Sequence, residues 1–393
     1  MAATNILLTF NAGSSSVKIG IFEIADAAAR MVGKAVVDLR AKPLVFEVSL
    51  GPKPFRTEMK SKVTDDLHAV IDEAFDILAG HFDMGAVVAA GHRVVHGGDR
   101  FVEAVRLDDA AIAAIDALTP LAPLHQPEAL RFIRAIRHLK PNLAQAASFD
   151  TAFHATQDDL VRRFAVPRAL HDEGIKRYGF HGLSYKFVSA ELARLAGKPV
   201  GRTIIAHLGS GASLCGLEDG ISRDCSMGFS TLDGIPMATR PGALDAGVVL
   251  HLLGQKKLSY ADVEDILYHR SGLLGISGTS ADARVLLADS RPEASEAIDL
   301  FALRIAGEIG RICSTLGGLD MLVFTAGIGE HQPEIRAKIV ERLAWLGAEL
   351  NPAANADNAF GISGDSSRIA IHVIATNEEQ VIADETLAII GQH

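Results

Sequence analysis

Charged and polar side chains stand at several points of this sequence in glycine-rich stretches that adjoin apolar runs. A charged side chain buried without a partner costs several kcal/mol. Read singly, each would be half of a buried salt bridge, for example Arg93 with Asp150. Together they favour an anion-binding site, and two arginines suit a carboxylate plus a transferring phosphoryl group. The residues are His92 and Arg93 in AAGHRVVHGG, Asp150 at the end of AASFD, His181 in YGFHGLS and Arg240 in PMATRPG.

Two loops of small residues follow predicted strands, and both could hold phosphate groups. The first is Gly13–Ser16 in NAGSSS, and the second is Gly209–Ala212 in HLGSGAS. Bare backbone N–H groups in such loops let the chain approach a phosphate closely. Lys18 follows the first loop and could reach the same phosphate. The sequence contains neither GxxxxGK[ST] nor GxGxxG, which excludes the P-loop and Rossmann motifs.

Two further stretches combine a predicted element boundary with chemistry-bearing residues. FTAGIGEH (324–331) follows an apolar strand and could hold a nucleotide base or ribose, or be only a tight strand-to-helix turn. TNEE (376–379) places two carboxylates at a predicted helix N-terminus. These carboxylates could cap the helix or bind magnesium.

The elements that would position these residues alternate between strands and helices. Strand patterns cover 5–10 and 17–24, and helical periodicity covers about 65–80 and 125–139. The second half opens with another strand–turn–strand pattern at 202–220. Further helices are predicted at about 244–254, 260–267, 280–289 and 294–316, with one more following the strand 321–327. A last strand spans 369–377, and a last helix begins at EEQV.

The two halves resemble each other in layout. A gapless superposition places Gly13 on Gly209, Gly20 on Gly216 and Glu23 on Asp219. This pattern indicates that one supersecondary unit opens each half, although two glycine–serine hairpins can look alike by chance. We therefore predict an α/β protein of two similar lobes, with ligands bound in the cleft that such lobes leave.

Composition limits the class of protein. The chain has 393 residues, 48% of them hydrophobic, which is too long for one ordinary core and predicts two domains. The net charge of −10, without a basic block, disfavours a nucleic-acid partner. No signal-peptide pattern opens the sequence, and no apolar run approaches the length of a membrane span. Cys215, Cys225 and Cys313 form no CxxC pair, so buried or free thiols in a reducing cytoplasm are expected.

The assembled motifs resemble the acetate kinase (acetokinase) family of the acetate and sugar kinase, Hsp70 and actin superfamily. The resemblance runs from one end of the chain to the other. Its motifs are NAGSSSVK (11–18), GHRVVHGG (91–98), APLHQP (122–127), FDTAFH (149–154), RYGFHGLS (177–184), HLGSGAS (207–213), SMGFSTLDG (226–234), GIGE (327–330) and TNEEQVIA (376–383).

The resemblance implies a fold and a reaction. The fold would have two similar actin-like (ribonuclease H-like) lobes around a central cleft, with a βββαβαβα-type core duplicated between them. Residues 1–150 plus 380–393 would form the lobe with the first phosphate loop and the substrate, and 151–379 the lobe with the second loop and the adenosine site. The reaction would be reversible, magnesium-dependent transfer of the ATP γ-phosphoryl group to acetate by direct in-line displacement. A cytoplasmic homodimer is also implied.

It also implies roles for individual residues. Asp150, His181, Arg240, Arg93 and His125 would be catalytic, with Arg93 also binding substrate beside Val95, Leu124 and Phe180. Asn11 and one glutamate, Glu378, would bind Mg²⁺ or Mn²⁺. The residues implied to bind ATP are Ser14, Ser16, Lys18, His207, Leu208, Gly209, Ser210, Gly211, Asp282, Ala283, Arg284, Ala326, Gly327, Ile328, Gly329 and Glu330.

The sequence departs from the family pattern at four places. Ser210 replaces the asparagine of HLGNG, and Gln126 replaces the asparagine of APLHNP. Leu183-Ser184-Tyr185 stands where members usually have TSH. Thr231 replaces the proline of SMGLTPLEG, which lies in the family's acyl pocket. A propionate or butyrate kinase therefore remains an alternative, as do a phosphohydrolase of the same fold and an ATP-driven interaction protein.

Overall fold

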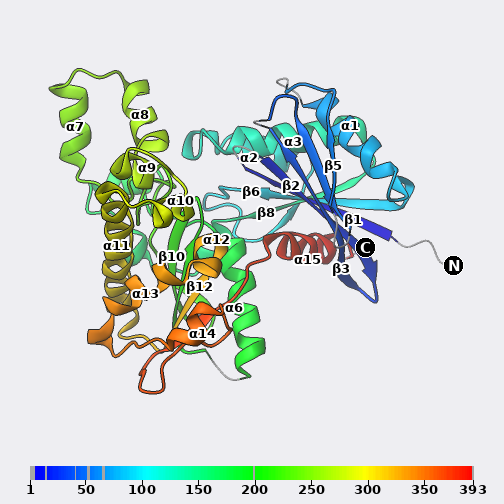
Figure 1. Ribbon diagram of the computed structural model, residues 1–393. Helices are drawn as coiled ribbons and strands as arrows, with labels where there is room; N and C mark the ends of the chain where they lie inside the picture. The colour runs from blue at the N-terminus through cyan, green and yellow to red at the C-terminus, as the bar shows by residue number, and fades with distance from the viewer. Residues whose placement is uncertain are drawn as a thin grey trace. The chain divides into compact units, whose positions relative to one another are not determined.

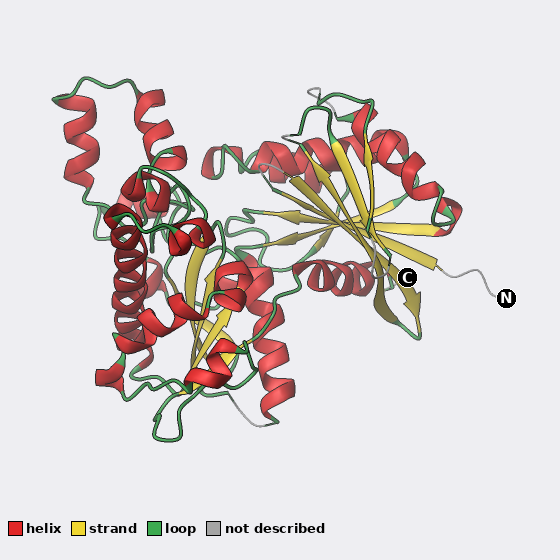
Figure 2. Ribbon diagram, viewed as in Figure 1, coloured by secondary structure: helices red, strands yellow, loops and turns green. Residues whose placement is uncertain are grey.

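The computed structural model describes residues 5–391 except 14, 15, 40, 51–53, 64–66, 198 and 199. The chain divides into two compact units. Unit 1 consists of Met1–Phe153 together with Asn377–His393, and unit 2 consists of His154–Thr376. Figures 1 and 2 show a β-sheet with helices on its faces in each unit, which confirms the predicted α/β class.

Unit 1 is built on a sheet of eight strands in the order β5-β4-β3-β2-β1-β6-β8-β7. Strands β1, β2 and β3 form an antiparallel meander, whereas β6 runs parallel to β1 and β8 runs parallel to β6. The strands are β1 (Asn5–Ala12), β2 (Ser16–Ala25), β3 (Ala28–Asp38), β4 (Val45–Ser49), β5 (Phe55–Glu58), β6 (Val87–Val94), β7 (Val105–Arg106) and β8 (Ala144–Phe149).

Alternation along β1 divides its side chains between two layers of helices. Ile6, Leu8 and Phe10 belong to an apolar cluster with residues of α1 (His68–Ala79) and α3 (Gln126–Leu139). Leu7 packs on the opposite face against α15 (Glu378–Ile390). Because strand side chains alternate, Asn11 is on the same face as Leu7. It therefore lies on the α15 side, beside Glu378 at the start of that helix.

Unit 2 repeats the strand order of unit 1. Its five-stranded sheet runs β11-β10-β9-β12-β13, with an antiparallel hairpin β9–β10 and parallel pairing of β9 with β12 and of β12 with β13. The same order, β3-β2-β1-β6-β8, occurs inside the sheet of unit 1. The strands are β9 (Arg202–Leu208), β10 (Ala212–Glu218), β11 (Ile221–Cys225), β12 (Met321–Thr325) and β13 (Ala370–Val373).

Helices complete both units. Helix α11 (Pro292–Leu316) packs on β10, where Gly216 has no room for a side chain because an added Cβ would meet Ile312 and Leu316. The prediction of a single helix after β12 is wrong: the structure has α12 (Ala326–His331) and α13 (Pro333–Glu341), divided before Pro333 because the residue before a proline avoids helical geometry. The remaining helices are α2 (Asp109–Asp116), α4 (Asp159–Arg162), α5 (Arg168–Asp172), α6 (Gly182–Ala196), α7 (Ala246–Gly254), α8 (Tyr260–His269), α9 (Gly272–Ser277), α10 (Ala283–Ala288) and α14 (Pro352–Ala356), with short 3₁₀ turns at Met84–Ala86, Thr119–Leu121, Ala152–His154 and Ala344–Leu346.

Two sequence expectations about the whole chain can be checked here. Cys215, Cys225 and Cys313 are all buried free thiols, as predicted. Within the part of the chain that the structure describes, no helix is long and apolar enough to cross a membrane.

Buried histidines make stability depend on pH. Burial lowers the pKa of His92 and of His154 from 6.5 to about 4, so both rings are neutral in the folded protein at pH 7. In the unfolded chain they bind protons below pH 6.5. We therefore expect the free energy of unfolding to fall as pH drops from 6.5 to 4, by roughly 2 to 3 kcal/mol for each ring. Urea unfolding between pH 6.5 and pH 4 measures this free energy. In a H92N variant, the free energy of unfolding should fall less steeply with decreasing pH.

Candidate active site

The first cluster gathers at the carboxyl ends of the parallel strands of unit 1. Arg93, near the end of β6, donates from Nε and Nη2 to the carboxylate of Asp150, which follows β8, with Nη2–Oδ2 at 2.5 Å. Its Nη1 donates to Asn11 Oδ1 at 3.1 Å. Asp150 is 1% exposed and Arg93 16%. Asp150 thus fixes the orientation of the Arg93 guanidinium by binding its Nε–Nη2 edge.

Two carboxylates at the start of α15 complete this cluster. Asn11 Nδ2 lies 2.8 Å from Glu378 Oε2 and 3.3 Å from Glu379 Oε1. Burial would lower the pKa of Arg93, but Asp150, Glu378 and Glu379 outweigh it and raise that pKa. The guanidinium is therefore a permanent cation held among three carboxylates.

The oxygens of Asn11, Glu378 and Glu379 are the donor type that Mg²⁺ and Mn²⁺ prefer. Mg²⁺ commonly takes one or two protein carboxylates and completes its shell with water and phosphate. In the described residues, no group of three or more His, Cys, Asp and Glu side chains forms a ready-made cage. The residues present fit a metal shared with a phosphate better than a closed structural site.

The second cluster surrounds the β9–β10 turn of unit 2. The rings of His181 and His207 stack with centroids 4.3 Å apart. A Cβ on Gly211 would lie 2.8 Å from Arg240 Nη2 and 3.3 Å from His181 Nε2, and one on Gly209 would lie 3.7 Å from His207 Nε2. The missing side chains therefore leave backbone exposed to a guanidinium and two imidazoles.

Arg240 differs from Arg93 in its electrostatic surroundings. Its Nη1 donates to the Thr231 carbonyl at 2.8 Å, and among the described residues no carboxylate lies within ion-pair distance. Burial lowers the pKa of Arg240, a shift that Tyr268 only partly opposes. A largely buried cation with no acidic partner is prepared to receive an anion.

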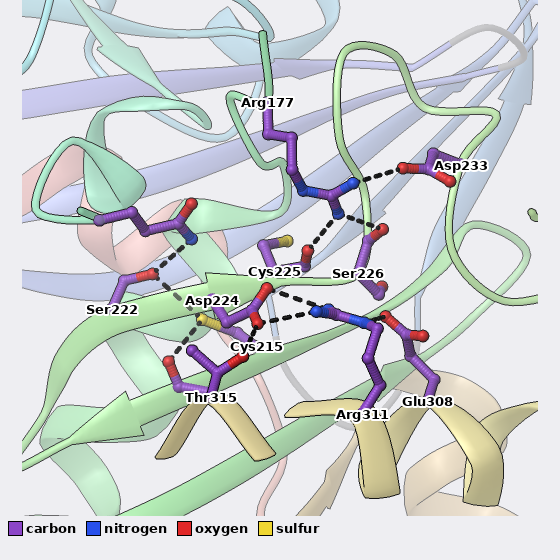
Figure 3. Close-up of polar contacts among 12 residues, drawn as sticks. Arg177, Cys215, Ser222, Asp224, Cys225, Ser226, Asp233, Glu308, Arg311 and Thr315 are labelled. Carbon is purple, nitrogen blue, oxygen red and sulfur yellow. Dashed lines mark hydrogen bonds and ion pairs between the residues drawn. The ribbon is translucent and has the colours of Figure 1, made fainter. Parts of the chain in front are cut away.

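The segment that carries Thr231 is anchored by ion pairs. Figure 3 shows Arg177 reaching Asp233 and the carbonyl oxygens of Cys225 and Ser226, at 3.0, 2.8 and 3.1 Å. These contacts tie residues 225–233 to the stretch that leads into His181. The carbonyl that holds Arg240 is therefore itself held.

Helix α11 also holds this segment, through hydrogen bonds to Asp224 of strand β11. Arg311 on α11 makes two hydrogen bonds to the buried carboxylate of Asp224, at 2.8 and 2.9 Å, and Thr315 donates to the same carboxylate at 2.6 Å (Figure 3). Strand β11 is thereby fixed to the long helix at the residue before Cys225. Sequence reasoning missed this network, because each member is separated from its partners by tens of residues.

We expect a G211A substitution to lower kcat, with a rise of about 1–2 kcal/mol in the activation free energy. The added methyl group would displace both Arg240 Nη2 and His181 Nε2. Steady-state assays measure the effect. G278A is a matched control, since a Cβ at Gly278 meets nothing within 4 Å; its φ of 67° makes some loss of stability expected there. Equal kcat values for G211A and the natural protein would contradict this geometry.

The stretches expected to contact adenosine lie at the starts of α10 and α12. Asp282 caps α10 and pairs with the exposed Arg284, a hydrogen bond that lowers the pKa of Asp282. Ala326 begins α12 with φ 64°, and Glu330 Oε1 accepts from the Thr376 N–H at 3.2 Å. No side-chain hydrogen bond joins the two stretches within the described residues. Gly327, Ile328 and Gly329 lie in α12, and Ala283 is the first residue of α10.

Arg336 is a site-supporting residue that the sequence analysis missed. It is fully buried, and burial lowers its pKa to about 10. All its donors are satisfied: Nη1 by the carbonyls of Gly329 and Glu330, Nε by Asn355 Oδ1, and Nη2 by Asn355 O and Asn358 Oδ1. It locks the C-terminal end of α12 in place. Its position beside Ile335 and Ile339 on the buried face of α13 was the available signal.

The other predicted residues are placed as follows. Val95 and Phe180 are buried, whereas Leu124 is 38% exposed just before His125, which occupies the N-cap position of α3 without a side-chain capping hydrogen bond. Lys18 is exposed on β2 opposite Asn11, and Ser16 begins β2. Leu208 ends β9, and the Ser210 carbonyl accepts from Ala238 N–H at 3.1 Å. Ser14 lies outside the described residues.

A family comparison gives this geometry a context. The model of the acetokinase family matches residues 6–384. The chain belongs to the acetokinase family. Its members include an acetate kinase of Methylocella silvestris, 42% identical over 398 residues, and one of Rhizobium meliloti, 44% identical over 391 residues, each with 98% of both chains covered.

Solved structures agree with this acetokinase membership. A propionate kinase from Francisella tularensis superposes with a TM-score of 0.91 at 34% identity, covering 98% of this chain and all of that one. Porphyromonas gingivalis acetate kinase gives a TM-score of 0.88 at 30% identity over the same coverage. The predicted family and two-lobed fold class are therefore confirmed.

Proposed function

We propose that this acetokinase-family kinase transfers the γ-phosphoryl group of ATP to acetate, reversibly, giving acetyl phosphate and ADP. The observation that carries the proposal is Arg240, a largely buried cation that faces a glycine turn and two imidazoles and that pairs with no carboxylate of the described residues. Full-length relatives named acetate kinase support the same reaction.

The chemistry of acetate assigns the roles. A carboxylic acid titrates near pH 4, so acetate is already a nucleophile at pH 7 and needs no base. Asp150 therefore orients Arg93, consistent with its hydrogen bonds to Nε and Nη2. The difficulty lies in bringing an anion to an anion. Arg93, Arg240, His125 and His181 would neutralise the acetate and the oxygens of the phosphoryl group during in-line transfer.

A divalent cation, Mg²⁺ or Mn²⁺, would be held by Asn11 and Glu378 and would supply charge neutralisation at the phosphates. Lys18, Ser14, Ser16 and residues 207–211 would contact the phosphates of ATP. Residues 282–284 and 326–330 would hold adenosine. Val95, Leu124 and Phe180 would line the acyl pocket. We further propose a cytoplasmic homodimer, in which residues 1–150 and 380–393 carry the acetate side and 151–379 the adenosine side.

A hydroxamate trap tests the proposal. Purified protein with ATP, Mg²⁺ and acetate should give acetyl hydroxamate in amounts equal to the ADP formed. ADP and phosphate released without acetate would instead indicate a phosphohydrolase. ATP binding without any acyl phosphate would indicate an ATP-driven interaction protein.

Propionate is the second candidate substrate, favoured by the similarity to the Francisella tularensis propionate kinase and by Thr231 at the family's proline position. One methylene in an apolar pocket changes kcat/KM by about 10- to 200-fold. We expect acetate to lead propionate, and butyrate to be poorer still. Competition assays measure the ratio. The variant T231P, which restores the family residue, should shift it if the pocket includes this position.

A further inference from the structure

The two stacked histidines of unit 2 share a pattern of hydroxyl partners. His181 Nδ1 lies 2.8 Å from Ser213 Oγ, and the Tyr185 hydroxyl lies 2.5 Å from the same Oγ. His207 Nδ1 lies 2.8 Å from Ser184 Oγ, which lies 2.8 Å from Thr376 Oγ1. In each case a serine hydroxyl occupies Nδ1, a second hydroxyl stands behind it, and Nε2 is the nitrogen near the glycine turn.

The two stacked rings adjoin the guanidinium of Arg240. Each imidazole stacks on the other at 4.3 Å, and His181 Nε2 and Arg240 Nη2 both approach Gly211. Arg240 thus places a positive charge close to the ring of His181, whereas the hydroxyls of Ser213 and Tyr185 carry no charge. A second positive charge beside Arg240 would be repelled. A neutral imidazole carries one proton, on either Nδ1 or Nε2.

We propose that Tyr185, acting through Ser213, is a positioning residue that keeps the proton of His181 on Nε2. The proposal rests on the proposed function for its catalytic consequence. A phenol donates more readily than an alcohol, so the Tyr185 hydroxyl donates to Ser213 Oγ. The single hydroxyl proton of Ser213 is then donated in a hydrogen bond to His181 Nδ1, which is the acceptor. The remaining nitrogen, Nε2, carries an N–H directed toward the same turn as Arg240.

This orientation is the useful one for an anionic reactant. An Nε2–H donates to a phosphoryl or carboxylate oxygen, whereas a lone pair on Nε2 would repel it. A neutral donor also avoids a proton that must be returned after each turnover. The backbone assists, because His181 has φ 58° and the Phe180 carbonyl before it accepts from His154 Nε2 at 3.0 Å. That hydrogen bond fixes the ring's point of attachment.

Tyr185 departs from the family pattern TSH, in which histidine is usual at the corresponding position. It is fully buried, as is Ser213, so solvent cannot replace the hydroxyl. The side chain also packs edge-on against His154 and His207. Phenylalanine would keep these ring contacts and remove only the oxygen. Y185F is thus a close test of the hydroxyl.

Nitrogen NMR of the histidine imidazoles reports the tautomer in the resting protein, whatever its substrate. The His181 signals are assigned from their loss in H181Q. We expect natural protein to show protonated Nε2 and bare Nδ1, and Y185F and S213A to show a mixture of tautomers. Ser184 lies on the same helix as Tyr185, but its hydroxyl is hydrogen-bonded to His207 Nδ1. The S184A variant should therefore leave the His181 signals unchanged.

Kinetics supply the second readout. We expect Y185F and S213A to lower kcat about tenfold with KM values for acetate and ATP within about twofold. Y185H should recover most of the loss. Should Y185F keep both the natural tautomer and the natural kcat, the proposal is overturned. Tautomer mixing in a protein that forms no acetyl phosphate would support the hydrogen-bond assignment while refuting the proposed reaction. S213A answers the question independently if Y185F does not fold.

Discussion

An R93A variant is expected to lose at least about 3 kcal/mol of transition-state stabilisation, seen as a fall in kcat of more than a hundredfold, and to be less stable as well. The catalytic loss follows from removing a permanent cation from the end of β6. The stability loss follows from Asp150, a 1% exposed carboxylate that would lose its hydrogen bonds to the guanidinium. Breaking one side of a buried ion pair costs about 3–5 kcal/mol.

Two further variants separate the catalytic role of Arg93 from its contribution to stability. An R93K variant keeps the charge but cannot make the two-pronged contact with Asp150, so it should recover part of the stability and little of kcat. A D150N variant should lower kcat through a misplaced guanidinium. The measurements are steady-state kinetics and urea unfolding on the same preparations. A rise in KM with kcat intact would exclude the proposed role of Arg93.

The sequence predicted the elements whose burial alternates cleanly. In α1 the residues expected to recur at helical spacing, such as Val70, Ile71 and Phe75, are buried, and β1 and β2 form the expected hairpin. The repeated opening of each half was also visible, since a strand–turn–strand pattern with small residues needs no distant partner to be recognised. The common strand order in the two sheets confirms the duplication.

Elements with polar residues on their buried faces were missed. Helix α6 buries Ser184, Tyr185 and Ser189, so its hydrophobic periodicity is weak although Gly197 gives it a glycine C-cap. The anion-site residues were predicted because arginine and histidine in glycine-rich stretches are conspicuous. Their hydroxyl partners were not, because contacts such as Ser184 with Thr376 join distant segments and leave no local pattern. The family resemblance supplied roles that residue types alone do not.

Replacing Arg240 should give the opposite result for stability. We expect R240A to lower kcat through a loss of at least about 3 kcal/mol of transition-state stabilisation, the same loss as expected for R93A. Its free energy of unfolding should stay the same or rise, because burial desolvates Arg240. In the described part of the chain, its side chain pairs with no acid and makes one hydrogen bond, to the Thr231 carbonyl. Removing an uncompensated buried charge relieves a cost that the folded state carries in the absence of substrate.

The contrast between the two arginines is the decisive measurement. Arg93 is held by Asp150 before substrate arrives, whereas none of the described carboxylates pairs with Arg240, so a bound anion would supply its counter-charge. Acetyl phosphate or ATP should therefore raise the melting temperature of the natural protein more than that of R240A, since a ligand stabilises the state that it binds. R240K is the control for charge without the planar fork. Marked destabilisation of R240A in the absence of ligand would show that Arg240 is structural, and would remove the main support for an anion site at the Gly209–Gly211 turn.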